Sequence, residues 1–318
     1  MISEFALDPE LVARWHDPRE WAFFREALAP DTGRVGSAFP RKWRKDVVKA
    51  FHRLFPGCTE ESRERGRLDA LLDRLGERMV ERESSHAECS TWLAKAIAEH
   101  RERPFHGILS VIPDASVPDV MTPEMLFSDR PPSAWSAPMN PAAPRTAVAF
   151  AEAVTPLLTR CREVVFVDPW FDPSKERFID PLRAMLAVLW GHDCCVSSPQ
   201  AQLVISEGRN DRKRDPRWLL QRCQERLPRI LPEGHSIQVT VLGQREGGEN
   251  IHNRYILTML AGISFGTGLD VADDGGIGQS DDLCRLSQKQ LLKRWGQYVS
   301  ARGSHFDIVA GPATVSSS

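Results

Sequence analysis

The sequence lacks long apolar runs, which argues against a membrane-embedded protein. No stretch approaches the ~20 consecutive apolar residues with which a helix crosses the hydrocarbon core of a bilayer. The first residues, MISEFALDPE, also lack the positive charge and the apolar segment of a secretory signal peptide. We therefore expect a cytoplasmic protein that has no membrane partner.

An excess of charge of one sign is missing too. The 41 lysines and arginines nearly balance the 43 aspartates and glutamates, which gives a formal net charge of −2. A nucleic-acid partner would therefore have to be held by a local basic patch, because the whole protein has no basic field.

The sequence contains no paired cysteines of the CxxC type. Its seven cysteines show neither that spacing nor the clustering of metal ligands. An odd number of cysteines without a signal peptide predicts reduced thiols in the cytosol. We expect no metal site and no cofactor.

The composition is that of a globular protein, with 42% hydrophobic and 26% charged residues, and the length of 318 residues suggests two domains. Apolar residues at helical spacing predict helices over residues 9–29, 41–55, 60–82 and 90–102, followed by a short strand-like run over 107–112. We predict a helical N-terminal domain over residues 1–112. Residues 113–144 are rich in proline, serine and methionine, which predicts a linker or a long loop.

From residue 145 onward, apolar runs alternate with helical patterns. Helices are predicted over residues 145–159, 176–190, 216–231 and 287–300. Strands are predicted over residues 163–167, 201–206, 237–242 and 251–258, and a further apolar run covers 262–267. This order predicts an α/β domain over residues 145–318 with a mixed, mostly parallel sheet.

One pair of residues suggests a chemical function. His252 and Arg254 follow a glycine-rich loop, residues 243–250, and fall on a predicted strand. Because side chains alternate along a strand, the two share one face. An imidazole can attack phosphorus or pass a proton, and a guanidinium can neutralise phosphate oxygens. The pair predicts a phosphodiester site, and a solvated polar pair is the alternative.

The residues around this pair resemble the phospholipase D superfamily. The superfamily motif is His-x-Lys, four residues and an aspartate, followed about six residues later by a Gly-Ser-x-Asn turn. His252 matches the histidine, Arg254 the lysine, and Gly266 with Thr267 the Gly-Ser pair. Upstream, residues 165–171 (VFVDPWF) resemble the strand and Asp-Pro-Tyr element that opens such domains. The resemblance implies a phospholipase D-like α-β-α sandwich over about half the chain.

The resemblance also implies a metal-independent mechanism with two histidines. One histidine forms a phosphohistidine, and the second protonates the leaving group. Here Met259 stands where the motif has aspartate, Leu269 stands where it has asparagine, and no other histidine begins a second motif. Catalysis by His252 and Arg254 would therefore require a homodimer. Phosphate binding without cutting is the alternative.

Four further residues are candidates for phosphate binding: Asp168, Glu207, Ser264 and Thr267. Asp168 and Glu207 follow predicted strands, at the edge where open α/β sheets bind ligands. Asp172 is a weaker candidate near the same edge, and Asp168 could instead cap the turn that begins the next helix.

Two basic segments are candidate nucleic-acid contacts. Lys42, Arg44 and Lys45 surround Trp43 on a predicted helix. Arg209, Arg212, Lys213 and Arg214 form a loop between a strand and a helix. Clustered cations of this kind bind phosphate backbones, although many such runs are only solvated helix faces.

These patterns predict a phosphodiesterase-like subunit of nuclease type that binds or cuts the backbone of DNA or RNA. By analogy alone, it would belong to a bacterial multi-protein system such as a defence module, together with partner proteins of one operon. The alternative is a catalytically inactive relative that binds phosphate or serves as a scaffold. A lipid-acting enzyme is less favoured, because no amphipathic segment suits a membrane surface.

Overall fold

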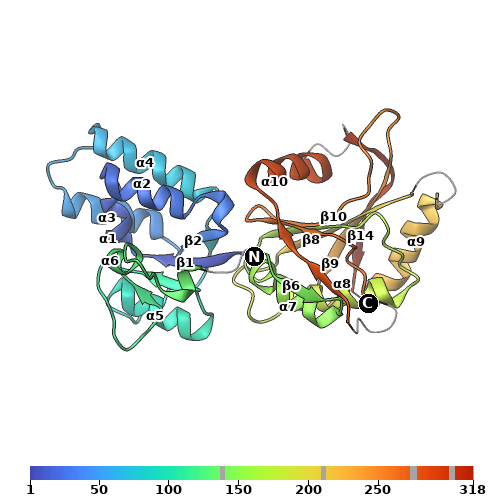
Figure 1. Cartoon of the computed structure of the whole chain (residues 1–318), viewed down its shortest axis with the longest axis horizontal. Helices are drawn as coiled ribbons and strands as arrows, with labels where there is room; N and C mark the ends of the chain where they lie inside the picture. Colours follow the sequence, from blue (N-terminus) through green and yellow to red (C-terminus); the bar gives the residue numbers. More distant parts are fainter. Residues whose placement is uncertain (137–139, 209–212, 273–277, 301–304, 318) are drawn as a thin grey trace. The chain divides into compact units, whose positions relative to one another are not determined.

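The computed structural model describes residues 1–136, 140–208, 213–272, 278–300 and 305–317 (Figure 1). The chain divides into two compact units: Ile2–Pro138, here the N-terminal unit, and Met139–Ser318 with Met1, here the C-terminal unit. Within the described ranges, every helix is too short or too polar to cross a membrane.

The N-terminal unit contains a five-stranded parallel sheet. Its strands are β1 (Ser3–Leu7), β2 (Arg34–Ala38), β3 (Val80–Glu81), β4 (Gly107–Leu109) and β5 (Val120–Met121). Their order across the sheet is β3-β2-β1-β4-β5. The chain therefore adds strands on one side of β1 first and then crosses to the other side.

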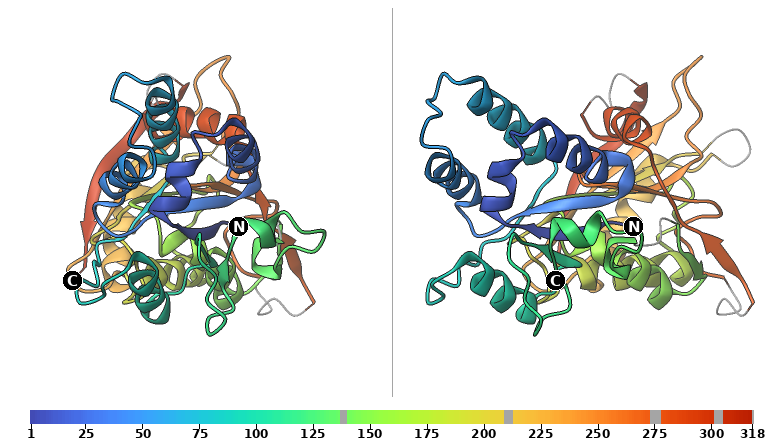
Figure 2. Two further views of the ribbon diagram at one scale, coloured as in Figure 1. Left: turned by 90° about the vertical axis from the view of Figure 1, so that its left-hand side faces the viewer. Right: turned by 60° about the vertical axis from the view of Figure 1, so that its left-hand side comes forward.

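Helices cover both faces of this sheet (Figure 2). They are α1 (Pro9–Arg14), α2 (Pro18–Ala27), α3 (Trp43–Leu54), α4 (Arg63–Gly76), α5 (Trp92–Glu102) and α6 (Pro123–Leu126). Phe5 and Leu7 of β1 belong to the core that α1, α2, α3 and α4 also line. Ala6 points to the other face, into a core shared with Ala96 of α5. This alternation along β1 buries the strand between two helical layers.

The prediction of a helical N-terminal domain is therefore wrong, because this unit is mixed α/β. The strand-like run predicted over residues 107–112 corresponds to β4, but β3 and β5 contain only two residues each, too few to show an alternating pattern in the sequence. The helices predicted over 41–55 and 90–102 correspond to α3 and α5. The helix predicted over 9–29 divides in two, because Asp17 caps α2 and Pro18 begins it.

The predicted linker over residues 113–144 is also wrong for most of its length. It contains β5 and α6, and Met121, Leu126 and Trp135 are buried in the core of the N-terminal unit. Its prolines shape local structure, since Pro123 begins α6. Residues 142–144 form β6 (Ala142–Pro144), which belongs to the C-terminal unit.

The C-terminal unit contains a seven-stranded sheet of order β13-β11-β10-β7-β8-β9-β14. Its strands are β7 (Glu163–Val167), β8 (Gln200–Ser206), β9 (Ser236–Gly243), β10 (Arg254–Leu257), β11 (Gly262–Phe265), β13 (Cys284–Arg285) and β14 (Asp307–Ser316). β12 (Ser280–Asp282) pairs with β6 in a separate two-stranded sheet. The four strands predicted for the centre of the sheet lie together, as expected.

The prediction that this sheet is mostly parallel is wrong. Among the described strands, β7, β8 and β9 are parallel neighbours, whereas β10, β11, β13 and β14 each run antiparallel to the strands they pair with. A parallel connection needs a crossover of a dozen residues or more. The turn of residues 258–261 between β10 and β11 is far shorter, so that pair can only be antiparallel.

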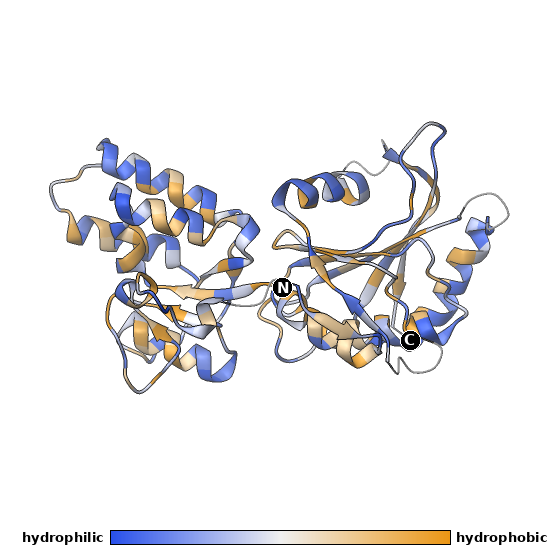
Figure 3. Cartoon of the chain, viewed as in Figure 1, coloured by the Kyte–Doolittle hydropathy of each residue, from blue (hydrophilic) through white to orange (hydrophobic). Residues whose placement is uncertain are grey.

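Helices also cover both faces of the C-terminal sheet. They are α7 (Ala147–Leu158), α8 (Glu176–Leu189), α9 (Pro216–Arg226) and α10 (Gln288–Trp295). Leu291 of α10 packs with Tyr255 and Leu257 on one face. Phe150 of α7 contacts Phe265 on the other, with ring centroids 5.4 Å apart. Figure 3 shows apolar colours concentrated in the strands and polar colours along the outer helix faces.

Candidate functional site

Three chain segments meet at one edge of the C-terminal sheet. Asp168 directly follows β7, which ends at Val167. β10 runs antiparallel to β7, with Tyr255 opposite Val167, so Arg254 at its start lies beside this end. β11 pairs its last residue, Phe265, with Arg254. Residues 266–270 therefore reach the same edge, and the fold brings Asp168 and Arg254 together from distant parts of the chain.

Asp168 is a buried carboxyl group with two backbone partners. Its Oδ1 accepts a hydrogen bond from the Trp170 N–H at 2.9 Å, and its Oδ2 accepts one from the Leu269 N–H at 3.3 Å. Burial raises the pKa of Asp168 to about 6, against the lowering effects of these hydrogen bonds and of the Arg254 charge. The charge at this edge therefore changes between weakly acidic and neutral pH.

Arg254 is half-buried and has unused hydrogen-bonding capacity. Its Nε is buried and lacks a hydrogen-bond partner among the described residues. The nearby chain is close-packed, since a Cβ added to Gly268 would lie 3.8 Å from this Nε. An unpartnered buried donor is costly and uncommon, so it marks a position where an anion would be stabilising.

His252 lies two residues before β10 and is exposed to solvent. The prediction that it sits on the strand is therefore wrong, because β10 begins only at Arg254. Its Nδ1 lies 3.4 Å from the carbonyl oxygen of Asn250, longer than a good hydrogen bond. The imidazole is thus accessible but weakly oriented.

Thr267 is engaged in an ionic network beside the site. Its hydroxyl donates to Asp281 Oδ2 at 2.8 Å and also accepts from the guanidinium of Arg145. Arg145 donates in addition to the carbonyl of Asp270 at 2.7 Å and to its carboxylate at 3.3 Å. These contacts fix the turn after β11, so Thr267 supports the site, and its hydroxyl is already satisfied.

Sequence reasoning missed Arg145 and Asp281 as parts of this network. They stand 136 positions apart, one at the start of a predicted helix and the other in an acidic segment. No local pattern connects two such residues. Only the pairing of β12 with β6, in which Asp281 lies opposite Ala143, brings them together.

Glu207 and the basic loop after β8 form a second cluster at the carboxyl ends of the parallel strands. Glu207 is buried, and its carboxylate lies 3.1 Å from Lys213 Nζ. Arg214 donates to the carbonyls of Pro169, Phe171 and Ser206 at 2.7–2.9 Å. Arg214 therefore holds two loops together, and its expected role as a phosphate contact is replaced by a structural one. Arg209 and Arg212 lie outside the described residues.

The positions of Asp172 and Ser264 do not fit the phosphate-binding role predicted for them. Asp172 accepts hydrogen bonds from the N–H of Ser174 at 3.0 Å and from its hydroxyl at 2.6 Å, and so shapes the turn before α8. Ser264 alternates with Phe265, which points toward α7 with Arg254. Ser264 therefore lies on the opposite face of the sheet from Arg254.

The predicted basic helix belongs to the N-terminal unit. Lys42, Arg44 and Lys45 at the start of α3 are exposed, and Arg44 forms an ion pair of 2.5 Å with Asp73. The three side chains form a local cationic surface on one helix, while Trp43 between them is buried.

Two of the three other described histidines of the C-terminal unit lie away from the site. His192 is exposed beside Asp193, and His235 stacks on Trp190 directly before β9, at the opposite edge of the sheet. His305 directly precedes Phe306, shortly before the edge strand β14, whose first residue, Asp307, pairs with Gly243 at the end of β9. His305 therefore lies at the same end of the sheet as Asp168, while His252 is the histidine next to Arg254 in the sequence.

One cluster of the N-terminal unit has metal-ligand character, namely His86, Glu99 and Glu102. Glu99, however, already accepts hydrogen bonds from Arg82, Ser84, His86 and Arg103. Arginine charges thus neutralise this carboxylate, and a cation would have to displace them. The cluster is better explained as a buried ionic network.

Comparison with models of known protein families finds no match, and no curated protein matches the sequence. The function is therefore argued from the chemistry of the edge formed by Asp168, His252 and Arg254.

Proposed function

We propose that the C-terminal unit is a phospholipase D-like module that binds the phosphodiester backbone of nucleic acid at the edge formed by His252, Arg254 and Asp168. One observation carries the proposal: Arg254 is half-buried at a sheet edge, and its buried Nε lacks a partner among the described residues. A phosphate group offers a guanidinium two acceptor oxygens in the geometry of its fork.

The neighbouring arginines support this assignment by contrast. Arg145 is bound to Asp270, Asp281 and Thr267, and Arg214 is bound to three backbone carbonyls. Both are used to hold loops in place. Arg254 is instead left with donor capacity beside a carboxyl group that loses its charge below about pH 6.

The exposed imidazole of His252 is the catalytic group of the proposed module. In the proposed reaction an imidazole nitrogen attacks phosphorus, the bond to the leaving oxygen breaks, and a second histidine supplies the proton to that oxygen. Water then hydrolyses the phosphohistidine. Since the sequence contains one such motif, the second histidine is proposed to come from another copy of the chain.

Two departures from the superfamily motif bear on turnover. Met259 lies in the turn after β10, at the end of the strand remote from Arg254, so its replacement of aspartate leaves the proposed site untouched. Leu269 lies in the site, but it contributes a backbone N–H to Asp168 and no polar side chain. Together with the weak orientation of His252, this favours the second candidate function, a module that binds phosphate without cutting it.

Binding can be measured with a fluorescein-labelled single-stranded oligonucleotide by anisotropy. Replacing Arg254 by alanine removes one charge-assisted contact, worth ~1.5–3 kcal/mol, and we expect affinity to fall roughly 10- to 100-fold. Arg222→Ala is the matched control, because Arg222 lies on α9 of the same unit and pairs only with Glu225 among the described carboxylates. Equal affinities of the Arg254→Ala and Arg222→Ala proteins would overturn the proposal.

A further inference from the structure

The N-terminal unit contains a second candidate site at a position that its strand order defines. In the order β3-β2-β1-β4-β5, the chain builds outward from β1 in one direction and then from β4 in the other. The connections leaving β1 and β4 therefore diverge to opposite sides. In open parallel sheets, ligands bind in the crevice that opens at the carboxyl ends of two such strands.

A cavity of about 540 Å³ lies at these carboxyl ends. Asp8 follows β1 directly, Ser110 follows β4 directly, and both line the cavity. The volume is within the range of small-molecule sites, roughly 300–1,000 Å³.

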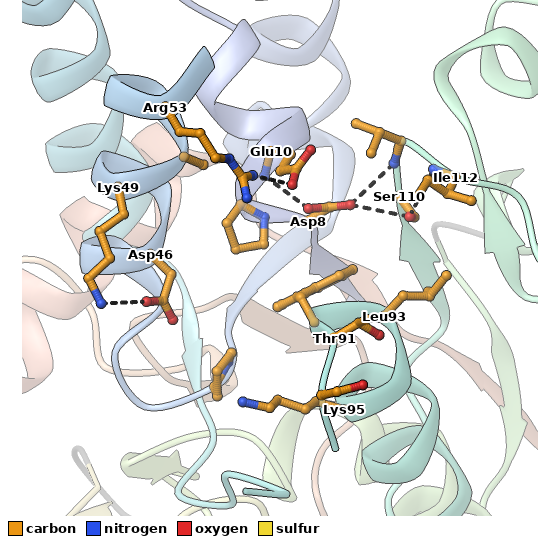
Figure 4. Close-up of a pocket in the computed structure, with 16 residues that line it drawn as sticks. Asp8, Glu10, Asp46, Lys49, Arg53, Thr91, Leu93, Lys95, Ser110 and Ile112 are labelled. Carbon is orange, nitrogen blue, oxygen red and sulfur yellow. Dashed lines mark hydrogen bonds and ion pairs between the residues drawn. The ribbon is translucent and has the colours of Figure 1, made fainter. Parts of the chain in front are cut away.

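Helices from the two faces of the sheet form the walls of this cavity. Asp46, Lys49 and Arg53 reach it from α3, whose buried residues pack on one face. Thr91 and Lys95 reach it from the start of α5, which packs on the other face (Figure 4). The cavity is thus the crevice between helical layers that the strand order predicts.

The cavity is lined by three cations and three carboxylates, and Arg53 pairs with Glu10 across it. Asp8 is held by the Glu10 N–H at 2.9 Å and by the Ser110 hydroxyl at 3.2 Å. Lys49 lies 3.5 Å from Asp46, an exposed and therefore weak pair. Lys95 is half-buried and forms no ion pair with the residues that the structure describes. A bound anion would meet Lys95 first and could recruit Lys49.

The remaining lining is apolar and extends to the mouth of the cavity. Pro40, Trp92 and Ile112 line it, and Ile112 is 62% exposed although it is a large aliphatic residue. A flat apolar group of a ligand would cover this surface. The Asp8, Glu10 and Asp46 carboxylates offer acceptors for hydroxyl groups.

We propose that this cavity binds a nucleotide, with its phosphate at Lys95 and Lys49, its ribose hydroxyls at the carboxylates, and its base against Trp92 and Ile112. Cation, acceptor and apolar surface are all present within one cavity of suitable size. A nucleotide is the class of small molecule that uses all three. The inference does not depend on the function proposed for the C-terminal unit.

Isothermal titration calorimetry of the full chain tests this proposal, with AMP, GMP, CMP and UMP as ligands and with adenosine and inorganic phosphate as partial ligands. We expect at least one nucleotide to bind, and adenosine and phosphate to bind at least tenfold more weakly, since each lacks part of the contact. Failure of all four nucleotides would overturn the proposal. Phosphate binding as tightly as the nucleotides would reduce the cavity to a general anion site and would overturn it as well.

Variants locate the binding. Lys95→Ala should weaken nucleotide affinity about tenfold or more, because a charged hydrogen bond to phosphate is lost. Arg101→Ala is the matched control, since Arg101 is exposed on the same helix and does not line the cavity. Lys95→Gln serves as a second variant that keeps most of the side-chain volume, and circular dichroism checks that both fold. Unchanged affinity in the Lys95 variants, or loss of nucleotide binding in Arg254→Ala, would place the site elsewhere.

Discussion

At the scale of single residues, the arginines of the C-terminal unit differ in what their donors already hold. Arg145 and Arg214 bind carboxylates, a hydroxyl and backbone carbonyls through both of their Nη atoms. Arg254 has a buried Nε without a partner in the described ranges. The sequence predicted Arg254 from the His-x-Arg spacing, but it placed Arg214 in the same class as a phosphate contact. Only the contacts of each guanidinium separate the two roles.

The carboxyl group of Asp168 should make anion binding depend on pH. Burial raises its pKa to about 6, so its competing negative charge disappears as the pH falls through that value. We expect oligonucleotide affinity to rise as the pH falls from about 7.5 to about 5.5, because a neutral Asp168 no longer competes with phosphate for Arg254. Asp168→Asn should remove most of this rise.

Anisotropy titrations at several pH values check this expectation. The parent protein and the Asp168→Asn protein should both carry His252→Gln, so that the imidazole contributes no change of charge. The same pH dependence in the Asp168→Asn protein as in its Asp168 parent would show that this carboxyl group does not control the site.

The buried ionic network of the N-terminal unit makes a prediction about stability. Arg82 donates to Glu4 at 2.6 and 2.8 Å and to Glu99 at 2.8 Å, and all three side chains are buried. Replacing Arg82 by methionine removes a charged partner from two buried carboxylates, which should cost about 3–5 kcal/mol of unfolding free energy. Urea unfolding followed by circular dichroism measures the loss. Arg44→Met, which removes only an exposed pair, should cost less than about 1 kcal/mol. Equal losses in both variants would contradict this view of the network.

The same network predicts how the stability of the fold changes at acid pH. Burial opposes ionisation of Glu99, but hydrogen bonds from Ser84, Arg103, Arg82 and His86 outweigh it and lower its pKa to about 2. A carboxyl pKa lowered by folding stabilises the protein above its unfolded value and loses that stabilisation as the pH falls toward the folded value. We therefore expect Glu99 to stabilise the fold above about pH 4.5 and to lose this effect between about 4.5 and 2. Glu99→Gln should flatten the fall in melting temperature over this window, and an unchanged fall would exclude Glu99 as its source.

At the scale of elements, α3 presents two distinct polar surfaces. Lys49 and Arg53 line the cavity, while Lys42, Arg44 and Lys45 at the start of the helix are exposed and do not. The basic pattern in the sequence predicted one nucleic-acid contact at Lys42, Arg44 and Lys45. In the structure these three side chains are exposed, whereas the later cations of the same helix, Lys49 and Arg53, line the cavity.

Replacing Lys42, Arg44 and Lys45 together by alanine should weaken oligonucleotide binding equally for all sequences and flatten its salt dependence. Phosphate contacts release counterions but do not read bases, so both effects follow from lost phosphate contacts. Anisotropy titrations over a range of salt concentrations give the slope. A slope equal to that of the wild type would mean that this surface does not touch the nucleic acid.

The elements of the C-terminal unit could largely be predicted from the sequence, whereas their neighbours in the sheet could not. The run over residues 163–167 is apolar after Glu163 and matches β7 at both ends. No pattern in β10 shows, however, that it pairs antiparallel with β7 and not with β9, the preceding strand. In the N-terminal unit, the two-residue strands β3 and β5 give no periodic signal, and the five-residue strands β1 and β2 were not predicted, so the sheet and the cavity at its edge were both missed.

At the scale of the whole molecule, hydrolysis by the C-terminal unit would require two copies of the chain. Mixing His252→Ala protein with wild type should then reduce activity more steeply than simple dilution, because each mixed dimer lacks one of its two histidines. A chelator should leave the rate unchanged, since the proposed chemistry uses no metal. A nuclease assay on labelled DNA and RNA provides the readout. Activity that falls only in proportion to the fraction of wild-type chains would contradict this mechanism. Activity abolished by a chelator would contradict it as well.

The two units have different proposed ligands, a phosphodiester backbone for the C-terminal unit and a nucleotide for the N-terminal unit. Their central common feature is a polar group at the carboxyl ends of parallel strands: Asp168 after β7 in one and Asp8 after β1 in the other. Asp168 lies near Arg254, and Asp8 lines the same cavity as Lys95. Neither cation forms an ion pair among the described residues.

The most direct test is a crystal structure of the chain with a short single-stranded oligonucleotide. We expect a backbone phosphate within hydrogen-bonding distance of the Arg254 guanidinium, with His252 on the same side of that phosphate. An oligonucleotide bound through other residues, with Arg254 and His252 free of phosphate, would contradict the function proposed for the C-terminal unit.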